Sequence, residues 1–208
     1  EKLTICFEIS DSAEINSMAE TAIEKSNEGF DVFCSVCTTD KKIDSFHRAK
    51  STDISCQTAI WTDIDIRGGK HEGEKYPPDF DTAKSFLSFE TSKDKIEGSM
   101  LVISGYGLHG YYLLNQPLII TDNNRETATQ TNKNLLDLIR KNAGEYAKAV
   151  DAVQDLSRVL RVPGTFNYKL KESPQIVSLA FTNDIRYDWA DLQTRTTPVM
   201  PIVTESDC

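Results

Sequence analysis

The segment 59–66, AIWTDIDI, constrains the fold more than any other part of this 208-residue chain. As a strand it would point alternate side chains to opposite faces of a sheet. Its three isoleucines would then lie on one face, which suits a core, while Asp63 and Asp65 would project side by side from the other. Two carboxylates so close repel each other unless a proton or a cation lies between them. The segment therefore predicts a buried strand with one acidic, metal-binding face, although an exposed strand with acidic decoration is an equally strong reading of this motif alone.

The remaining pattern of apolar residues predicts helices and strands without a regular βαβ alternation. Helices are expected over residues 12–26 (capped by Asp11), from residue 79, and over 124–148 and 153–160. Strands are expected over residues 30–38, 58–66, 100–104, 109–114 and 176–181. These elements favour an α+β fold with a largely antiparallel sheet. We expect residues 1–195 to form one compact domain of two subdomains, and residues 196–208, with Pro198 and Pro201, to form a tail.

Composition limits the class of protein. Hydrophobic residues make up 39% and charged residues 26%, as in ordinary globular proteins. No apolar run approaches the roughly 20 residues that cross a bilayer, and we expect a cytoplasmic protein without membrane contact. The net charge of -9 counts against a surface that binds nucleic acid everywhere, so any such binding needs a local basic groove.

The five cysteines include a CxxC pair, Cys34 and Cys37. With His47 and Cys56 they form an alternative hypothesis, a structural zinc site. A single CxxC lacks the paired spacing typical of such sites, and thiols are common in protein cores. The pattern therefore favours reduced thiols, and zinc is not expected.

A second motif, SGYGLH, covers residues 104–109 and follows a predicted strand. Two glycines between strands allow backbone N–H groups to approach an anion closely, and Ser104 and His109 add side-chain donors. A plain glycine turn with an incidental histidine is the alternative, and for this motif alone it is favoured.

The third segment, residues 150–169, reads VDAVQDLSRVLRVPGTFNYK. It combines Asp151 and Asp155 with Arg158, Arg161 and Lys169. Carboxylates beside cationic side chains suit a site that holds a metal and a triphosphate together. An amphipathic helix with solvated ion pairs is the more common origin of such a pattern.

In this order, the three segments resemble the prim-pol group of the archaeo-eukaryotic primase superfamily. The resemblance covers residues 30–169 and includes the flanking Trp61 and the run YYLL at 111–114. It implies an RRM-like sheet joined to a smaller N-terminal α/β unit, with the active site in the cleft between them.

The resemblance also implies roles for individual residues. Asp63, Asp65 and Asp151 match the metal-binding acids, with Asp155 as the alternative to Asp151. Nucleotide-binding positions match Ser104, Gly105, Gly107, His109, Arg158, Arg161, Asn167 and Lys169. Arg48 and Lys50 fall, more loosely, where the family carries a phosphate contact.

The implied activity is template-directed nucleotidyl transfer from a dNTP or NTP to a 3′-hydroxyl, with two Mg²⁺ or Mn²⁺ ions. The implied partners are a single-stranded DNA template, a primer, and fused or associated domains outside this chain. Two rivals remain open: a nucleotide-sugar transferase that uses the DxD motif, and an RRM-like binding module without catalysis. A rolling-circle nuclease ranks low, because it needs paired histidines and the three in this chain, His47, His71 and His109, lie far apart in sequence.

Overall fold

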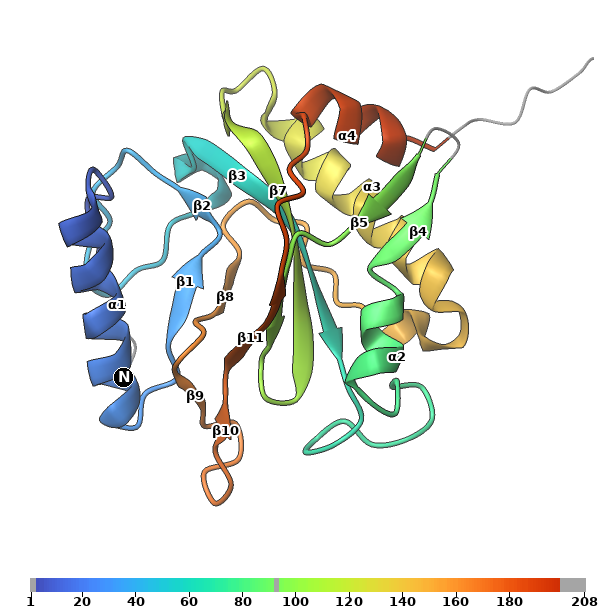
Figure 1. The fold of residues 1–208 in the computed structure, drawn as a ribbon. Helices are drawn as coiled ribbons and strands as arrows, with labels where there is room; N and C mark the ends of the chain where they lie inside the picture. Colours follow the sequence, from blue (N-terminus) through green and yellow to red (C-terminus); the bar gives the residue numbers. More distant parts are fainter. Residues whose placement is uncertain (1–2, 92–93, 199–208) are drawn as a thin grey trace, which may run out of the picture.

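A five-stranded antiparallel sheet forms the centre of the molecule (Figure 1). The structure, a computed structural model, describes residues 3–91 and 94–198. The strand order is β11–β6–β7–β3–β2. The strands span Cys37–Thr38 (β2), Cys56–Asp65 (β3), Met100–Ile103 (β6), Gly107–Ile119 (β7) and Ser178–Thr182 (β11).

The pairing of β3 with β7 sets the position of the acidic motif. The register runs from Cys56 opposite Ile119 to Asp65 opposite Gly107, and it places Asp63 opposite His109. Because side chains alternate along a strand, Asp63, Asp65 and His109 share one face of the sheet. The fully buried Ile60 and Ile64 lie on the other face, as the alternation of residues 59–66 predicts.

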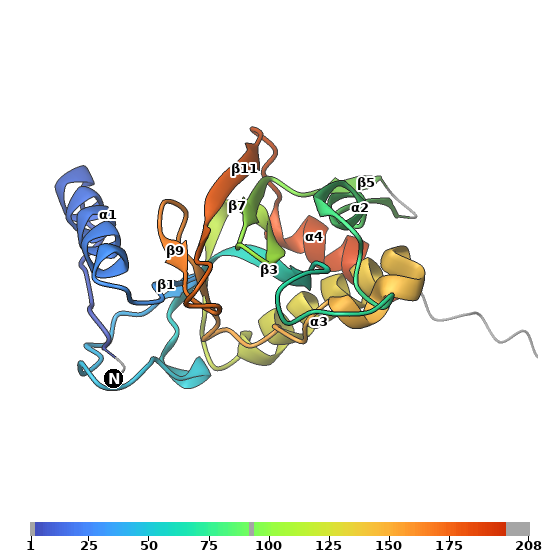
Figure 2. The same ribbon diagram turned by 90° about the horizontal axis from the view of Figure 1, so that it is seen from below.

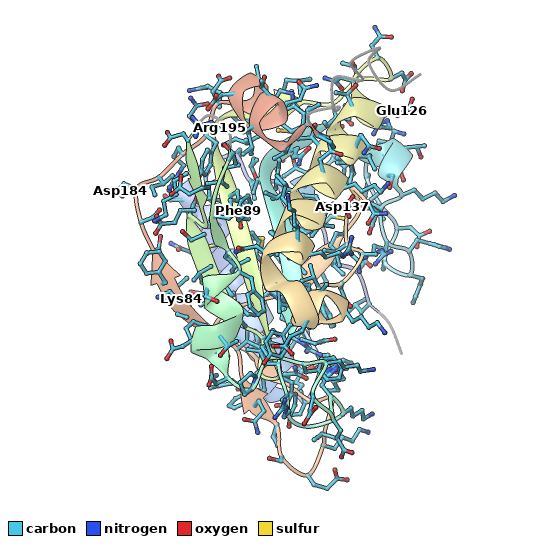
Figure 3. The ribbon with its side chains drawn as sticks, turned by 90° about the vertical axis from the view of Figure 1, so that its right-hand side faces the viewer. Lys84, Phe89, Glu126, Asp137, Asp184 and Arg195 are labelled. Carbon is cyan, nitrogen blue, oxygen red and sulfur yellow. The ribbon has the colours of Figure 1, made fainter. Side chains whose placement is uncertain are left out.

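Helices cover the face that carries Ile60 and Ile64. They are α2 (Phe80–Ser85), α3 (Arg125–Ala143), which continues into the 3₁₀ helix η2 (Gly144–Ala149), and α4 (Trp189–Thr196). Leu135, Leu136 and Ile139 of α3 are fully buried, as expected for its apolar stripe. Figure 3 looks onto this layer, with Lys84 on α2, Asp137 on α3 and Arg195 on α4 labelled. The helical layer leaves the opposite face, with its acids, available for a ligand.

A smaller unit from the N-terminal part of the chain lies beside the acidic face. Its helix α1 (Ser12–Asn27) is capped by Asp11, as predicted. Strand β1 (Phe33–Ser35) pairs with β8 (Val159–Arg161), and β9 (Phe166–Asn167) pairs with β10 (Gln175–Ile176). Figure 2 shows α1, β1 and β9 on one side of the sheet and α2, α3 and α4 toward the other. Two small elements complete the fold, the 3₁₀ turn η1 (Ser51–Asp53) and the hairpin of β4 (Ser88–Glu90) and β5 (Lys95–Glu97).

The predicted helix over residues 153–160 is wrong. Val153 and Leu156 are buried in an irregular segment, and Val159, Leu160 and Arg161 form β8. Their partner β1 places Phe33 opposite Arg161 and Ser35 opposite Val159. Pairing with a strand more than 100 residues away thus overrides the local apolar spacing, which resembles that of a helix.

Other helices and strands also differ from the sequence predictions. The helix expected to reach residue 148 ends at Ala143, because Gly144 has φ +58 and the chain tightens into η2. The strand expected over 30–38 divides into β1 and β2 at Val36, and that over 176–181 divides into β10 and β11. Helix α4 was not predicted, and Thr196, the expected start of the tail, is its buried last residue. Residues 199–208 of that tail lie outside the described residues.

The α+β class with a largely antiparallel sheet is confirmed. Across the described ranges, no helix is long and apolar enough to cross a membrane.

Candidate active site

Asp151 reaches the acidic strand through backbone pairing along the free edge of β3. Val150 forms an antiparallel bridge with Ile64, and the Asp151 N–H donates to the carbonyl of Asp63 at 2.9 Å. The indole N–H of Trp61, fully buried on the acidic face, donates to the carbonyl of Val153 at 2.7 Å. These bonds bring the third acid of the sequence motifs beside the first.

Asp63, Asp65 and Asp151 line one pocket of about 440 Å³ between the sheet and the N-terminal unit. The sheet also supplies Ser104, Tyr106 and His109. The N-terminal unit and the strands paired with it supply Asp31, Phe33, Val159, Leu160, Arg161, Asn167 and Lys169, and the loop after β3 supplies His71. Three motifs separated by up to about 100 residues of sequence therefore converge on one cavity.

Mutual repulsion and burial dominate the electrostatics of the acids. Burial first, and then the Asp151 and Asp65 carboxylates, raise the pKa of Asp63 to about 7. Burial also raises the pKa of Asp65, against the opposing effect of His71. Burial and neighbouring negative charge thus disfavour the ionised form of both carboxyl groups, and a cation bound between them would favour it.

His109 lies next to these acids as a neutral side chain. Its burial, and then the Arg161 cation, lower its pKa to about 3, so the imidazole is uncharged at pH 7. Its Nε2 lies 3.7 Å from Asp63 Oδ1, and its buried Nδ1 has no hydrogen-bond partner among the described residues. A buried nitrogen without a partner is costly, so a ligand that bonds to it is favoured.

Two cationic side chains, Arg161 and Lys169, also line the pocket. Arg161 pairs with Asp31, and its guanidinium lies over the Phe33 ring at 4.7 Å from the centroid. Lys169 Nζ lies 2.6 Å from His71 Nε2, and the same nitrogen of His71 lies 3.2 Å from Asp65 Oδ1. The pocket thus holds cationic side chains together with the acids.

Asn167 ties two of the motifs together. Its side-chain amide donates to the Ser104 carbonyl at 2.6 Å, and its Oδ1 accepts from the Lys169 N–H at 2.9 Å. Asn167 is 3% exposed, so these bonds are shielded from water. It therefore fixes the position from which Lys169 reaches the pocket.

The glycines of the second motif allow close packing. Gly105 has φ +100, and a Cβ there would meet Gln175 at 2.9 Å and Asn167 at 3.1 Å. A Cβ on Gly107 would lie 2.7 Å from the carbonyl oxygen of Ile64. Ser104 and Tyr106 line the pocket, and the two glycines do not appear in its lining.

The other candidate residues lie away from this pocket. Asp155 pairs with Arg158 at 2.9 Å and lines a second cavity, near the start of α3. Arg48 and Lys50 lie in the exposed loop before η1 and do not line the pocket. His47, one of the residues of the zinc hypothesis, contacts Asp44 at 2.7 Å.

Six residues of the pocket lining were not predicted as site residues: Asp31, Phe33, His71, Tyr106, Val159 and Leu160. Nothing in the sequence singles out Asp31 and Phe33, whose place depends on the β1–β8 pairing. His71 lies in a stretch of polar residues that reads as an ordinary loop. A reciprocal backbone pair with Gly68, at 2.9 Å in both directions, holds it in place.

A divalent cation fits the chemistry of the three acids. No three His, Cys, Asp or Glu side chains of the described residues form a ready-made metal-binding group. Asp63 Oδ1 lies 3.7 Å from His109 Nε2, and Asp65 Oδ1 lies 3.2 Å from His71 Nε2, so each carboxylate has a histidine beside it. Three mutually repelling carboxylates in one pocket still match the oxygen ligands that Mg²⁺ and Mn²⁺ prefer.

The raised pKa of Asp63 predicts a pH-dependent stability difference. With a chelator present, Asp63→Asn should stabilise the fold by about 1–3 kcal/mol at pH 8 and by almost nothing at pH 4. The folded protein holds the proton up to a pH of about 7, whereas the unfolded chain releases it near 3.8, so the unmodified protein loses stability between those values. His109 contributes the opposite slope between its pKa of about 3 and 6.5, and subtracting the two proteins removes that contribution.

Urea unfolding at several pH values measures this difference. Asp184→Asn provides the matched control, because it makes the same change at an exposed carboxylate outside the pocket. A flat profile for Asp63→Asn would contradict the burial and repulsion described for Asp63.

The sequence matches no protein-family model and no curated protein. Among solved structures, the chain is similar to the AEP domain of the primase-polymerase of cyanophage S-2L. The TM-score is 0.54 at 14% identity, over 86% of this chain and 76% of that chain. The chain therefore shares the overall fold of that domain.

Proposed function

We propose that the chain is the catalytic core of a primase-polymerase, and that it transfers nucleotides from dNTPs or NTPs to a 3′-hydroxyl under the direction of a DNA template. One observation carries the proposal: Asp63, Asp65 and Asp151 converge in one pocket that Arg161 and Lys169 also line. The proposal places the chain in the prim-pol family and in the cytoplasm. Its partners are a single-stranded template, a primer and associated domains.

Asp63, Asp65 and Asp151 would hold the divalent cations. When bound, these ions lower the pKa of the attacking hydroxyl and offset the charge of the triphosphate. The raised pKa of Asp63 supports this role, because a bound cation would favour the ionised carboxylate that burial and the neighbouring acids disfavour.

The cationic side chains that line the pocket would bind the triphosphate. Arg161 carries a guanidinium suited to bidentate contacts with phosphate, and Asp31 with Phe33 orients it before the substrate arrives. Lys169 supplies a second positive charge beside His71. Neutral His109 has one ring N–H to donate to a phosphate oxygen, and transfer then depends on positioning and charge.

The same arrangement supports this function over the two rivals. A nucleotide-sugar transferase would use the DxD pair without needing the second and third motifs in the same cavity. An RRM-like binding module would present aromatic side chains on the open face of the sheet. Here the centre of that face carries Asp63 and Asp65 beside His109.

Primer extension tests the proposal. A primed single-stranded template, Mg²⁺ or Mn²⁺, and either dNTPs or NTPs should give extension by the unmodified chain, and Asp63→Ala/Asp65→Ala should abolish it. Circular dichroism would show that the double variant is folded. Extension that survives the double substitution would place the chemistry elsewhere.

Lys169→Ala should raise the KM for the nucleotide about tenfold, with a smaller change in kcat. The substitution removes one charge-assisted contact with the triphosphate, worth about 1.5 kcal/mol. The matched control is Lys171→Ala, an exposed lysine two residues away that does not line the pocket. Steady-state incorporation at varied nucleotide concentration measures KM and kcat. Equal values for the two variants would contradict a contact between Lys169 and the triphosphate.

A further inference from the structure

The loop of residues 41–50, KKIDSFHRAK, is a concentration of positive charge in an acidic chain. It carries four Lys or Arg residues and one acid, while the whole chain has a net charge of -9. Lys41 pairs with Asp53 at 3.0 Å. Lys42, Arg48 and Lys50 are exposed and form no ion pair with any described residue. These three charges are available to an anionic partner.

Phe46 projects from the middle of this basic loop. Its side chain is 70% exposed, more than any other large apolar side chain of the described residues. The loop is anchored around it: Asp44 accepts from the Phe46 N–H at 2.8 Å, and the Thr4 N–H donates to the Ser45 carbonyl at 2.7 Å. An anchored loop holds the ring in solvent, where burial against a flat apolar surface would be favourable.

We propose that the basic loop binds single-stranded nucleic acid outside the active-site pocket. Lys42, Arg48 and Lys50 would neutralise phosphates, and Phe46 would stack on a base. A cationic surface combined with an exposed aromatic ring is the chemistry that binds single strands without sequence preference. The proposal rests on the proposed function only for the identity of the strand, the template or the primer.

The loop lies within reach of the pocket. Phe33 lines the pocket, and Lys41 follows it eight positions later in the sequence, so their Cα atoms are at most about 29 Å apart. A strand rising about 3.4 Å per nucleotide covers that distance with eight or nine nucleotides. In Figure 2 the loop, drawn in light blue, lies below α1, on the side of the molecule away from α2, α3 and α4. A single strand can thus contact both places at once.

This location also gives Arg48 and Lys50 a role. The family resemblance loosely implies a phosphate contact for them, yet they do not line the pocket that holds the acids. At the loop, Arg48 and Lys50 would contact a phosphate of the nucleic-acid backbone, and they would not need to reach the triphosphate.

Anisotropy of a fluorescent 20-nucleotide oligo-dT tests the proposal, in EDTA and without nucleotide so that no catalysis is needed. Phe46→Ala should weaken binding about fivefold to tenfold and leave the salt dependence unchanged. The triple variant Lys42→Ala/Arg48→Ala/Lys50→Ala should lower the slope of log Kd against log salt by about 2. Controls are Ile119→Ala, with a 63% exposed side chain, and Lys133→Ala/Lys141→Ala/Lys148→Ala, which removes three exposed charges near α3.

The proposal fails if the loop variants bind like their controls, or if the unmodified chain does not bind the oligonucleotide. It also fails if the loop binds anionic phospholipid vesicles and not DNA. Binding that depends on the loop, in a chain that does not extend a primer, would support this inference and contradict the proposed function. The two proposals can therefore fail separately.

Discussion

Asp151→Asn will lower the rate of nucleotide addition about a thousandfold, whereas Asp155→Asn will leave it within about threefold. The sequence alone leaves these two acids as competing candidates. In the structure Asp151 hydrogen-bonds to the backbone of Asp63 and lines its pocket, while Asp155 pairs with Arg158 at a second cavity. Removing one charge from three clustered carboxylates weakens cation binding and the charge stabilisation that transfer requires.

Single-turnover incorporation at saturating metal measures the chemical step for both variants. Because Asn has nearly the same shape as Asp, the fold should be retained, and thermal unfolding would confirm that. Loss of activity in Asp155→Asn with retention in Asp151→Asn would show that the wrong acid has been assigned to the site.

Trp61→Ala will destabilise the protein by about 3–5 kcal/mol, the usual cost of removing a buried Trp. Trp61 is fully buried under the segment that carries Asp151, and its indole N–H bonds to the Val153 carbonyl. Trp61→Phe keeps most of the packing and leaves that carbonyl without its donor, which should cost about 1–2 kcal/mol. We also expect activity about tenfold to a hundredfold lower in Trp61→Phe, because a displaced Asp151 no longer meets Asp63.

The chain offers a matched control in its other tryptophan. Trp189 begins α4, packs against the core, and does not line the pocket. Trp189→Phe should change stability by less than about 1 kcal/mol and leave transfer unchanged. Urea unfolding and primer extension on the same samples separate the two effects, and equal activity of the two Phe variants would contradict the anchoring role of Trp61.

The strand that carries the acids was predictable because its signal is local. Alternation along residues 59–66 depends only on neighbours, and the structure places Asp63 and Asp65 on one face and the isoleucines toward the helices. The same holds for α1, whose cap at Asp11 accepts from the N–H groups of Ala13 and Glu14. Short-range chemistry decides both elements.

The residues that sequence reasoning missed depend on contacts between distant segments. Phe33 and Asp31 join the pocket only because β1 pairs with β8, and that pairing makes residues 159–161 a strand where a helix over 153–160 was expected. His71 reaches Asp65 and Lys169 because its loop folds back along β3. The spacing of residues within a single segment does not encode contacts between distant segments. The motifs therefore predicted the acids of the site, but not Asp31, Phe33 or His71.

Template-directed nucleotidyl transfer is tested by single-nucleotide incorporation on four primed templates that differ only in the templating base. Each template is incubated with each of the four dNTPs, and then each of the four NTPs, in Mg²⁺ or Mn²⁺. Each template should direct incorporation of its complementary nucleotide, and the Asp63→Ala/Asp65→Ala variant should incorporate none. No incorporation under any of these conditions, or the same nucleotide added on all four templates, would contradict template-directed transfer.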